Sequence, residues 1–388
     1  MTTARLDLWK IRLYYFLWVG GAGFLLPFIN LFFTDRGLSG TEIGLLGTLG
    51  SVAALIAAPV WGRVSDAATR PRRLVQFGLL ESALAMLVLS QQTIFAWMAV
   101  IIALDSLLSA GVFPLSDALA LSIARGGGTG FGSVRLWGSL GWAVAALVGG
   151  WLIERTGLFA MFAGYVLCGL TGIVIVGLIR TDLRRGTAGA REPGASVRRV
   201  LRDVLKDRSL IGLAIALSVV WFATIGYHQF EPVYLDQLGA GETLIGLAST
   251  LGALVELPAM LWADRLTRHH GAERLLRFSF VLDVLRLAGI LIAPSVAAIL
   301  VSRAIGGVAY SFYVIALTEF VGEHAPNRQV ATMLALFTVT LPGLVRMVAA
   351  PASGWVFDRV GAYWLYAIAL GGTAIAWVVM RLTAARKT

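Results

Sequence analysis

Ten charged residues lie within long apolar stretches of this 388-residue chain: Glu81, Asp105, Asp117, Arg135, Glu231, Glu256, Asp283, Arg286, Arg303 and Arg346. If these stretches cross a bilayer, each charge costs at least ~2.5–3.5 kcal/mol and is a candidate functional residue. Six acids face four arginines, so full ionisation would leave excess negative charge in a medium of low dielectric constant. We expect at least one acid to be protonated near neutral pH, as a proton carrier must be. The alternative for any one residue is a static ion pair or a place in a hydrated crevice.

The most specific pattern lies where the apolar stretch 95–121 leads into the stretch 134–153. Asp117 precedes Arg135 by eighteen residues, and Trp142 follows Arg135 by seven, so Arg135, Gly138 and Trp142 share one helix face. A guanidinium is a planar fork of donors that can hold vicinal hydroxyls or a carboxylate, and an indole beside it can stack on a sugar or aromatic ring. The pattern predicts a binding site for a small solute. Trp142 alone would equally suit packing or contact with lipid.

A second polar face is expected in the stretch 209–235. His228 and Glu231 are three residues apart and so lie on the same side of a helix. Pro232 follows them and weakens the helix, which frees backbone groups that can line a cavity.

Motifs typical of enzymes and of metal or cofactor sites are missing. The chain has no HExxH, GxSxG, P-loop or dinucleotide-binding sequence. Its one cysteine, Cys168, excludes an intramolecular disulfide, and its four histidines show no metal-ligand spacing. We expect neither an enzyme nor a protein that needs a cofactor or metal.

Composition predicts an all-α integral membrane protein. Hydrophobic residues make up 58% of the chain, charged residues 14%, and the mean hydropathy is +0.80, whereas soluble domains are about 45–50% apolar and about 25% charged. Stretches long enough to cross a bilayer as helices number twelve. They are 11–33, 43–62, 74–91, 95–121, 134–153, 158–179, 209–235, 243–262, 275–293, 296–320, 330–356 and 362–382.

The basic residues predict the orientation. Twenty-five of the 32 Lys and Arg fall on one side of these spans, together with both termini, and this side is cytoplasmic by the positive-inside rule. The net charge of +10 is then explained by loops that face anionic membrane lipids, and no nucleic acid is expected as a partner. Arginine outnumbers lysine 29 to 3, which suggests a prokaryotic gene and hence a cytoplasmic membrane.

Two six-helix halves are expected, residues 1–180 and 209–388, joined by a cytoplasmic linker at 181–208. The linker is rich in Arg, Gly and Ala, and residues 197–206 in it suit a short amphipathic helix on the membrane surface. An internal repeat supports the division: GLSGTEIGLLGTLG at 37–50 recurs as GAGETLIGLASTLG at 239–252.

With twelve spans, this half-repeat and a charged central loop, the chain resembles the major facilitator superfamily, in which two bundles of nested three-helix repeats alternate their access to the two sides. The superfamily's loop motif G-x-x-x-D-R-x-G-R-[KR] appears in degraded form as GRVSDAATRPRR. The resemblance makes Gly62, Asp66 and Arg70 candidate gating residues.

Within the superfamily, PLSDALA and RLWGS resemble segments of the lactose permease-like oligosaccharide:proton symporters and of the phenylpropionate and nucleoside permeases. The resemblance implies that Glu231 pairs with Arg303, with Asp283 and Arg346 in the same charge network. His228 replaces a permease carboxylate, so no ion pair with Arg346 is expected at neutral pH. The substrate-binding residues that follow are Asp117, Arg135, Trp142, Tyr227, His228, Glu256, Arg286 and Tyr310.

Proton coupling must use a residue other than the permease's helix 10 acid, because the sequence RAIGGVAYSFY at 303–313 has no carboxylate. We rank Glu256 and Glu231 ahead of Asp117 as the proton carrier.

These residues favour a proton-coupled symporter of a small sugar or glycoside that works by alternating access. Aromatic acids and nucleosides remain alternative substrates. A proton-driven exporter of amphipathic compounds is a further alternative, although AALVGG at 145–150 lacks the Gly-Pro of the drug antiporter motif GP-x-x-GG. A solute-sensing receptor is the third class. Nothing in the sequence requires an oligomer, so we expect a monomer.

Overall fold

The computed structural model describes residues 3–68, 70–180, 197–325 and 329–383, and every regular element in these ranges is helical. The helices of the first part of the chain are α1 (Thr3–Leu25), α2 (Ile29–Asp35), α3 (Gly40–Ala67), α4 (Pro71–Ser90), α5 (Phe95–Ser109), α6 (Val112–Gly126), α7 (Gly132–Thr156) and α8 (Phe159–Leu178). Those of the second part are α9 (Val197–Val204), α10 (Arg208–Gln237), α11 (Glu242–His270), α12 (Ala272–Ile292), α13 (Val296–His324), α14 (Val330–Ala335), the π-helix η1 (Leu336–Thr340), α15 (Leu341–Val360) and α16 (Ala362–Thr383).

Eleven helical stretches in the described part of the chain are long and apolar enough to cross a membrane. They coincide with eleven of the twelve predicted spans. The other predicted span, 275–293, is also a helix, α12, with 21 residues. It falls outside this group because Arg277, Asp283 and Arg286 lie close together in it. Charges at membrane depth are rare and mark candidate functional residues.

The chain divides into two compact units. Of the described residues, unit 1 contains 3–180 and 239–250, and unit 2 contains 197–238 and 251–383. Residues 239–250, which we expected in the second half, group with unit 1 because the first turns of α11 lie on α7. There, Thr250 Oγ1 donates to Ala143 O at 2.8 Å, and Gly246 faces Ala146 O. Most of the predicted linker, residues 181–196, lies outside the described residues.

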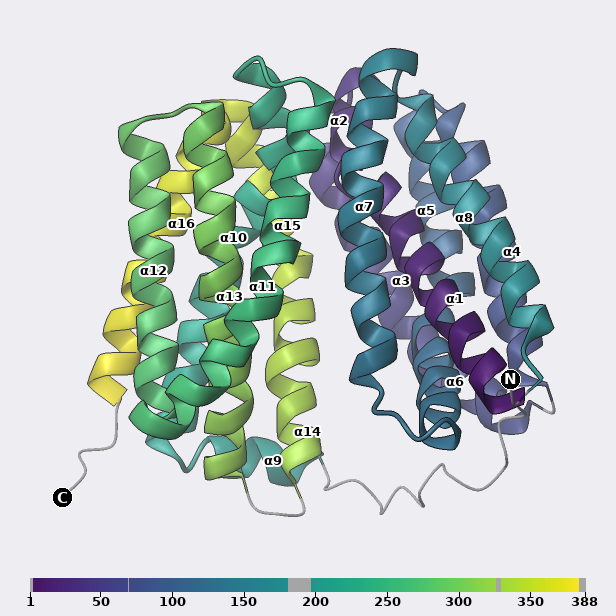
Figure 1. The fold of residues 1–388 in the computed structure, drawn as a ribbon. Helices are drawn as coiled ribbons and strands as arrows, with labels where there is room; N and C mark the ends of the chain where they lie inside the picture. Colours follow the sequence, from purple (N-terminus) through teal and green to yellow (C-terminus); the bar gives the residue numbers. More distant parts are fainter. Residues whose placement is uncertain (1–2, 69, 181–196, 326–328, 384–388) are drawn as a thin grey trace. The chain divides into compact units, whose positions relative to one another are not determined.

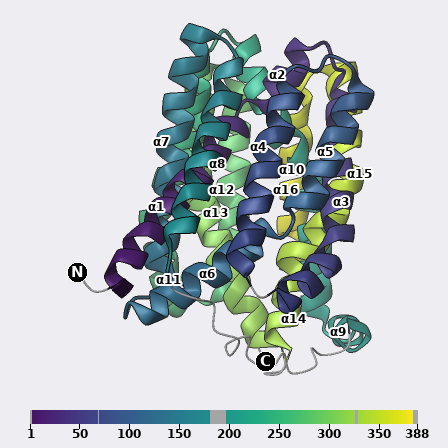
Figure 2. The same cartoon turned by 90° about the vertical axis from the view of Figure 1, so that its right-hand side faces the viewer.

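In unit 1, α1 packs along α7 and α8, and Figures 1 and 2 show these helices side by side. Glycines make the approach close: a Cβ on Gly141 would lie 2.0 Å from Phe16 O, as expected where small residues let helices meet in a membrane. One predicted span, 95–121, is broken into α5 and α6. Trp61 fills the break, because its ring lies against Gly111 and its Nε1 donates to Leu107 O at 2.8 Å.

In unit 2, α10 packs on α15 and α16, and α12 packs on α13 and α16. The π-helix η1 ends two residues before Pro342, whose ring cannot continue a regular hydrogen-bond ladder. Figure 2 shows α9 almost end-on, so α9 runs across the long helices, in agreement with the short surface helix predicted at 197–206. It contacts α10 and α14.

The three candidate gating residues lie around the end of α3. Gly62 faces open space, and Ser65 Oγ donates to its carbonyl at 2.8 Å. Arg70 directly precedes α4 and caps it without a side-chain hydrogen bond. The side chain of Asp66 lies outside the described part of the structure.

The contact between α1 and α7 gives a first testable prediction. In Gly141→Ala, the new methyl group would meet the backbone of Phe16, which cannot rotate away, so the two helices must separate. Overpacking of this kind typically costs about 1–3 kcal/mol of folding free energy. The melting temperature of the purified protein should therefore fall by several degrees. Gly132→Ala is the matched control, because a Cβ at Gly132 on the same helix meets no atom within 4 Å. Equal melting temperatures for the two variants would contradict this packing.

Candidate functional site

Unit 1 holds a polar group deep among its aromatic residues. Asp117 on α6 accepts a hydrogen bond at Oδ1 from the Tyr15 hydroxyl on α1. The neighbouring hydroxyls of Tyr14 and Ser116 are bonded at 2.7 Å, and Trp18 stacks on Tyr14 with ring centroids 5.8 Å apart. Asp117 is therefore hydrogen-bonded to a tyrosine and lies beside a group of aromatic rings.

Arg135 is the cation of this group. Its Nη1 lies 3.0 Å from the point where a Cβ on Gly138 would be, so the guanidinium lies over the helix face that the absent side chain leaves open. The guanidinium is also within electrostatic reach of Tyr15. In the described part of the chain, Arg135 forms neither a hydrogen bond nor an ion pair with protein groups. Asp117 and Arg135 are thus near the same tyrosine without being paired, and the guanidinium fork is free for a ligand.

Trp142 lies two turns further along α7. Its Nε1 donates to Ser249 Oγ at 3.1 Å, and among the described residues no other aromatic ring stacks on its indole. The hydrogen bond holds the indole ring in place, and no aromatic ring of the described residues covers either face of the indole. Such an indole can serve as a stacking platform.

Unit 2 contains a buried ion pair between α10 and α13. Arg303 Nε donates to Glu231 Oε1, and the Tyr366 hydroxyl donates to Glu231 Oε2 at 3.0 Å. Glu231 is only 2% exposed, so both of its oxygens are used inside the protein. The pairing expected from the resemblance is therefore present in the structure.

Arg286 on α12 forms the second charged group of unit 2. It donates from Nε to Asp283 Oδ1 at 2.5 Å, from Nη2 to the Tyr227 hydroxyl at 2.6 Å and from Nη1 to Ser302 Oγ at 3.4 Å. We expected Asp283 and Arg346 to belong to the pairing network. Asp283 is instead bonded to Arg286 on its own helix, because three residues bring them to one face.

Three candidate residues of unit 2, namely Arg346, His228 and Glu256, form no side-chain hydrogen bond within the described ranges. Arg346 has no ion pair or hydrogen bond, and its charge acts on His228. The His228 ring lies 4.1 Å from that of Tyr227. The Glu256 carboxylate has no hydrogen-bond partner either, although Arg303 lies within electrostatic reach of it. Tyr310 is exposed and lies 6.2 Å from Tyr313 between ring centroids.

Sequence reasoning missed Tyr15, Tyr366 and Ser302, which complete the three charge groups. Tyr15 belongs to an aromatic run at the start of the first span, and that run was a usable signal. Tyr366 and Ser302 lie far along the chain from their partners, and only the packing of α16 and α13 brings them there.

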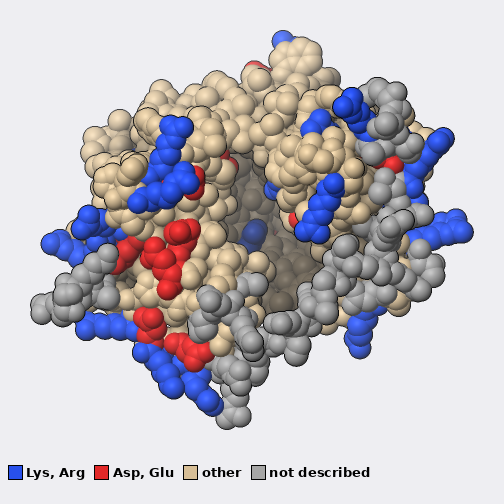
Figure 3. Space-filling view, turned by 60° about the horizontal axis from the view of Figure 1, so that its bottom comes forward, with Lys and Arg blue, Asp and Glu red and all other residues tan. Residues whose placement is uncertain are grey.

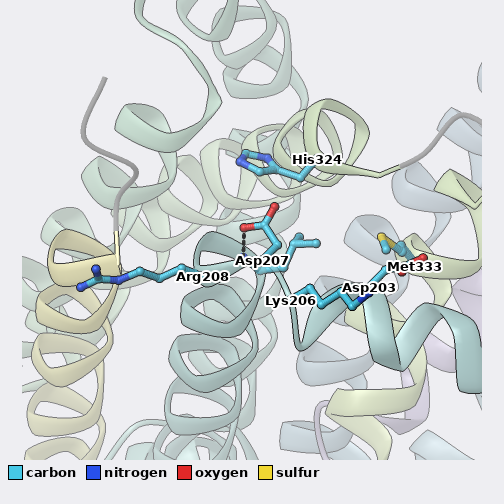
Figure 4. A pocket seen from close by; sticks show the side chains of 7 residues that line it. Asp203, Lys206, Asp207, Arg208, His324 and Met333 are labelled. Atoms are coloured by element: carbon cyan, nitrogen blue, oxygen red, sulfur yellow. Dashed lines mark hydrogen bonds between the residues drawn. The ribbon is translucent and has the colours of Figure 1, made fainter. Parts of the chain in front are cut away.

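A surface cavity of about 390 Å³ lies elsewhere in unit 2, near α9 (Figure 4). Its walls include Asp203, Lys206, Asp207 and His324, and Asp207 is engaged as the N-cap of α10. Figure 3 shows Lys and Arg side chains gathered around this end of each unit, with Asp and Glu among them. The cavity contains none of the ten deep charges, so it is separate from the candidate site. In the described ranges, no group of three or more His, Cys, Asp or Glu could hold a metal ion.

Comparison with known proteins identifies the type of molecule. A sequence model described as the MFS_1 like family matches residues 8–368. The chain belongs to this family of major facilitator transporters. It is 28% identical to the maltose permease of Geobacillus stearothermophilus, over 91% of this chain and 89% of that one. It is 26% identical to a probable 3-phenylpropionic acid transporter of Escherichia coli, over 71% of each chain.

The fold comparison agrees with this assignment. The crystal structure of the nucleoside transporter NupG matches with a TM-score of 0.83 at 15% identity, over 98% of this chain and all of that one. This likeness confirms the predicted major facilitator fold of two six-helix bundles. The protein is a multi-pass membrane transporter, and the prediction that it is not an enzyme is confirmed.

The Glu231–Arg303 pair gives a second testable prediction. Removing either partner leaves an unpaired buried charge, for which the typical penalty is ~3–5 kcal/mol, whereas removing both is often tolerated. Glu231→Ala and Arg303→Ala should each lower melting temperature and folded yield strongly, and the double variant should recover much of the loss.

The exposed pair Asp264–Arg268 on α11, with an N–O distance of 2.6 Å, provides the control cycle. Its coupling should be within about 0–1 kcal/mol. A Glu231/Arg303 double variant no more stable than the worse single variant would show that the two charges do not stabilise each other.

Proposed function

We propose that this transporter is a proton-coupled symporter of a small sugar or glycoside in the cytoplasmic membrane of a prokaryote, with both termini in the cytoplasm. The observation that carries the proposal is the arrangement on α7. Arg135 presents an unengaged guanidinium, and Trp142 presents an indole that Ser249 holds in place. Such a fork can bind vicinal hydroxyls while the indole stacks on the apolar side of a sugar ring.

The similarity to a maltose permease over nine-tenths of the chain supports the same substrate class. Glu256 is our first proton carrier because its carboxylate has no hydrogen-bond partner in the described structure, whereas both oxygens of Glu231 are engaged.

An aromatic acid is the second candidate substrate. Arg135 and Arg346 both lack an acidic partner among the described residues, and a guanidinium binds a carboxylate in two-pronged fashion. The similarity to a probable 3-phenylpropionic acid transporter is consistent with this alternative.

Counterflow in proteoliposomes separates these candidates. Purified protein is reconstituted with unlabelled solute inside, and entry of the labelled solute is followed for maltose, other glycosides, 3-phenylpropionate and nucleosides. We expect saturable counterflow of a sugar or glycoside, and accumulation of that sugar when the outside is made acidic. Counterflow of the aromatic acid alone would replace the sugar proposal by the second candidate.

A further inference from the structure

Two of the ten deep charges, Glu81 and Asp105, belong to none of the three charge groups above. Glu81 lies on α4 and Asp105 on α5, and these helices pack against each other within unit 1. The two carboxyl groups lie within electrostatic reach of one another. The transport scheme proposed above assigns no role to either residue.

Both carboxyl groups have an oxygen that nothing in the described structure satisfies. Glu81 Oε2 and Asp105 Oδ1 are completely buried and have no hydrogen-bond partner. No Lys or Arg of the described chain forms an ion pair with either residue. Glu231, Asp283 and Asp117, by contrast, each have an arginine or a tyrosine.

Hydroxyl groups on neighbouring helices lie beside the pair. From α8, the Tyr165 hydroxyl bonds to Ser82 Oγ at 2.7 Å, and Ser82 lies within hydrogen-bonding reach of Asp105. From α6, Val112 faces α4 at Gly78, and from α3, Gly50 faces α5 at Ser106.

The electrostatic consequence follows from this setting. Two like charges in a medium of low dielectric constant cannot both remain ionised without a compensating cation. In the described ranges, no group of three or more His, Cys, Asp or Glu could hold a metal ion, and this site has only two carboxylates. A proton needs only one carboxylate to accept it and a second to share it.

We propose that Glu81 and Asp105 form a proton-binding carboxyl pair, an ion site in unit 1 that is separate from the substrate-binding residues. In binding, a hydronium ion gives its proton to one carboxylate oxygen and leaves as water. The new O–H group then donates to the other carboxylate, as in pairs of acids that share one proton. The Ser82 and Tyr165 hydroxyls beside the pair provide a chain of exchangeable protons.

Infrared spectroscopy of the full-length protein tests the site without any substrate, so its result is independent of the proposed function. The C=O stretch of protonated carboxyl groups is recorded from acidic to alkaline pH for the wild type, Glu81→Gln, Asp105→Asn and the exposed control Glu323→Gln on α13. We expect the wild type and the control to keep a protonated carboxyl band at pH 7. The double variant Glu81→Gln/Asp105→Asn, recorded in the same way, should lose absorbance equal to one carboxyl group, because neither side chain can then hold the shared proton.

Thermal unfolding provides the second measurement. A proton held only by the folded state stabilises that state, and this stabilisation is lost as alkaline pH removes the proton. The wild type should therefore lose melting temperature toward alkaline pH more steeply than the double variant Glu81→Gln/Asp105→Asn, in which no charge can form.

Three results would overturn the proposal. The first is an infrared spectrum of the double variant that equals that of the wild type. The second is parallel pH dependence of melting in the wild type and the double variant. The third is a wild-type carboxyl band that disappears at pH 7 when potassium is replaced by sodium, because the pair would then bind a metal cation in place of a proton.

Discussion

Arg135→Lys should abolish most of the substrate binding of this transporter. Lysine keeps the positive charge but presents a single ammonium group in place of a planar fork, so it cannot hold two hydroxyls or both carboxylate oxygens at once. Loss of one charge-assisted hydrogen bond costs ~1.5–3 kcal/mol, which corresponds to roughly a 10- to 150-fold increase in Kd. Because Arg135 has no protein partner in the described structure, folding should be little affected.

Ligand-dependent thermal shift of the purified protein, with the solute that counterflow identifies, measures this effect. Arg125→Lys is the matched control, since Arg125 is exposed in the last turn of α6. If Arg135→Lys binds the solute like wild type, Arg135 does not anchor the substrate. Other residues, Trp142 among them, would then have to supply the binding energy.

Local sequence was sufficient to predict the membrane helices, because each needs a long run of apolar residues whatever its neighbours are. It was also sufficient for α12, although its three clustered charges lower its hydropathy. The break between α5 and α6 could not be predicted in the same way. It depends on Trp61, which lies 46 residues before the carbonyl of Leu107 to which it donates.

The candidate site was predictable to the extent that its residues share one helix. Arg135, Gly138 and Trp142 follow from helical spacing, as does the bond between Arg286 and Asp283. Contacts between helices that are far apart in the sequence were harder to predict. Tyr15 and Tyr366 reach Asp117 and Glu231 only because of how α1 and α16 pack, and hydropathy carries no information on that packing.

The second large effect is expected at Glu256, because its carboxylate has no hydrogen-bond partner in the described ranges. In a symporter, an acid that touches the substrate couples the two ligands when its protonation removes a charge and lets the substrate complete its hydrogen bonds. Glu256 meets the structural requirement, since its carboxylate is not engaged by protein groups in the described ranges. Glu231 does not, because Arg303 and Tyr366 occupy both of its oxygens.

Glu256→Gln mimics the protonated acid permanently, so it should abolish proton-driven accumulation while retaining counterflow. In the wild type, affinity should be highest at acidic pH and should fall as alkaline pH removes the proton. The variant's affinity should be flat between about pH 5 and 9, the range in which buried carboxyls titrate. Both are measured in proteoliposomes under an imposed pH difference, with Glu323→Gln as the exposed control. A Glu256→Gln protein that still accumulates solute against its gradient would exclude Glu256 as the carrier. The role would then pass to Glu231, where the same substitution also removes the charge that pairs with Arg303.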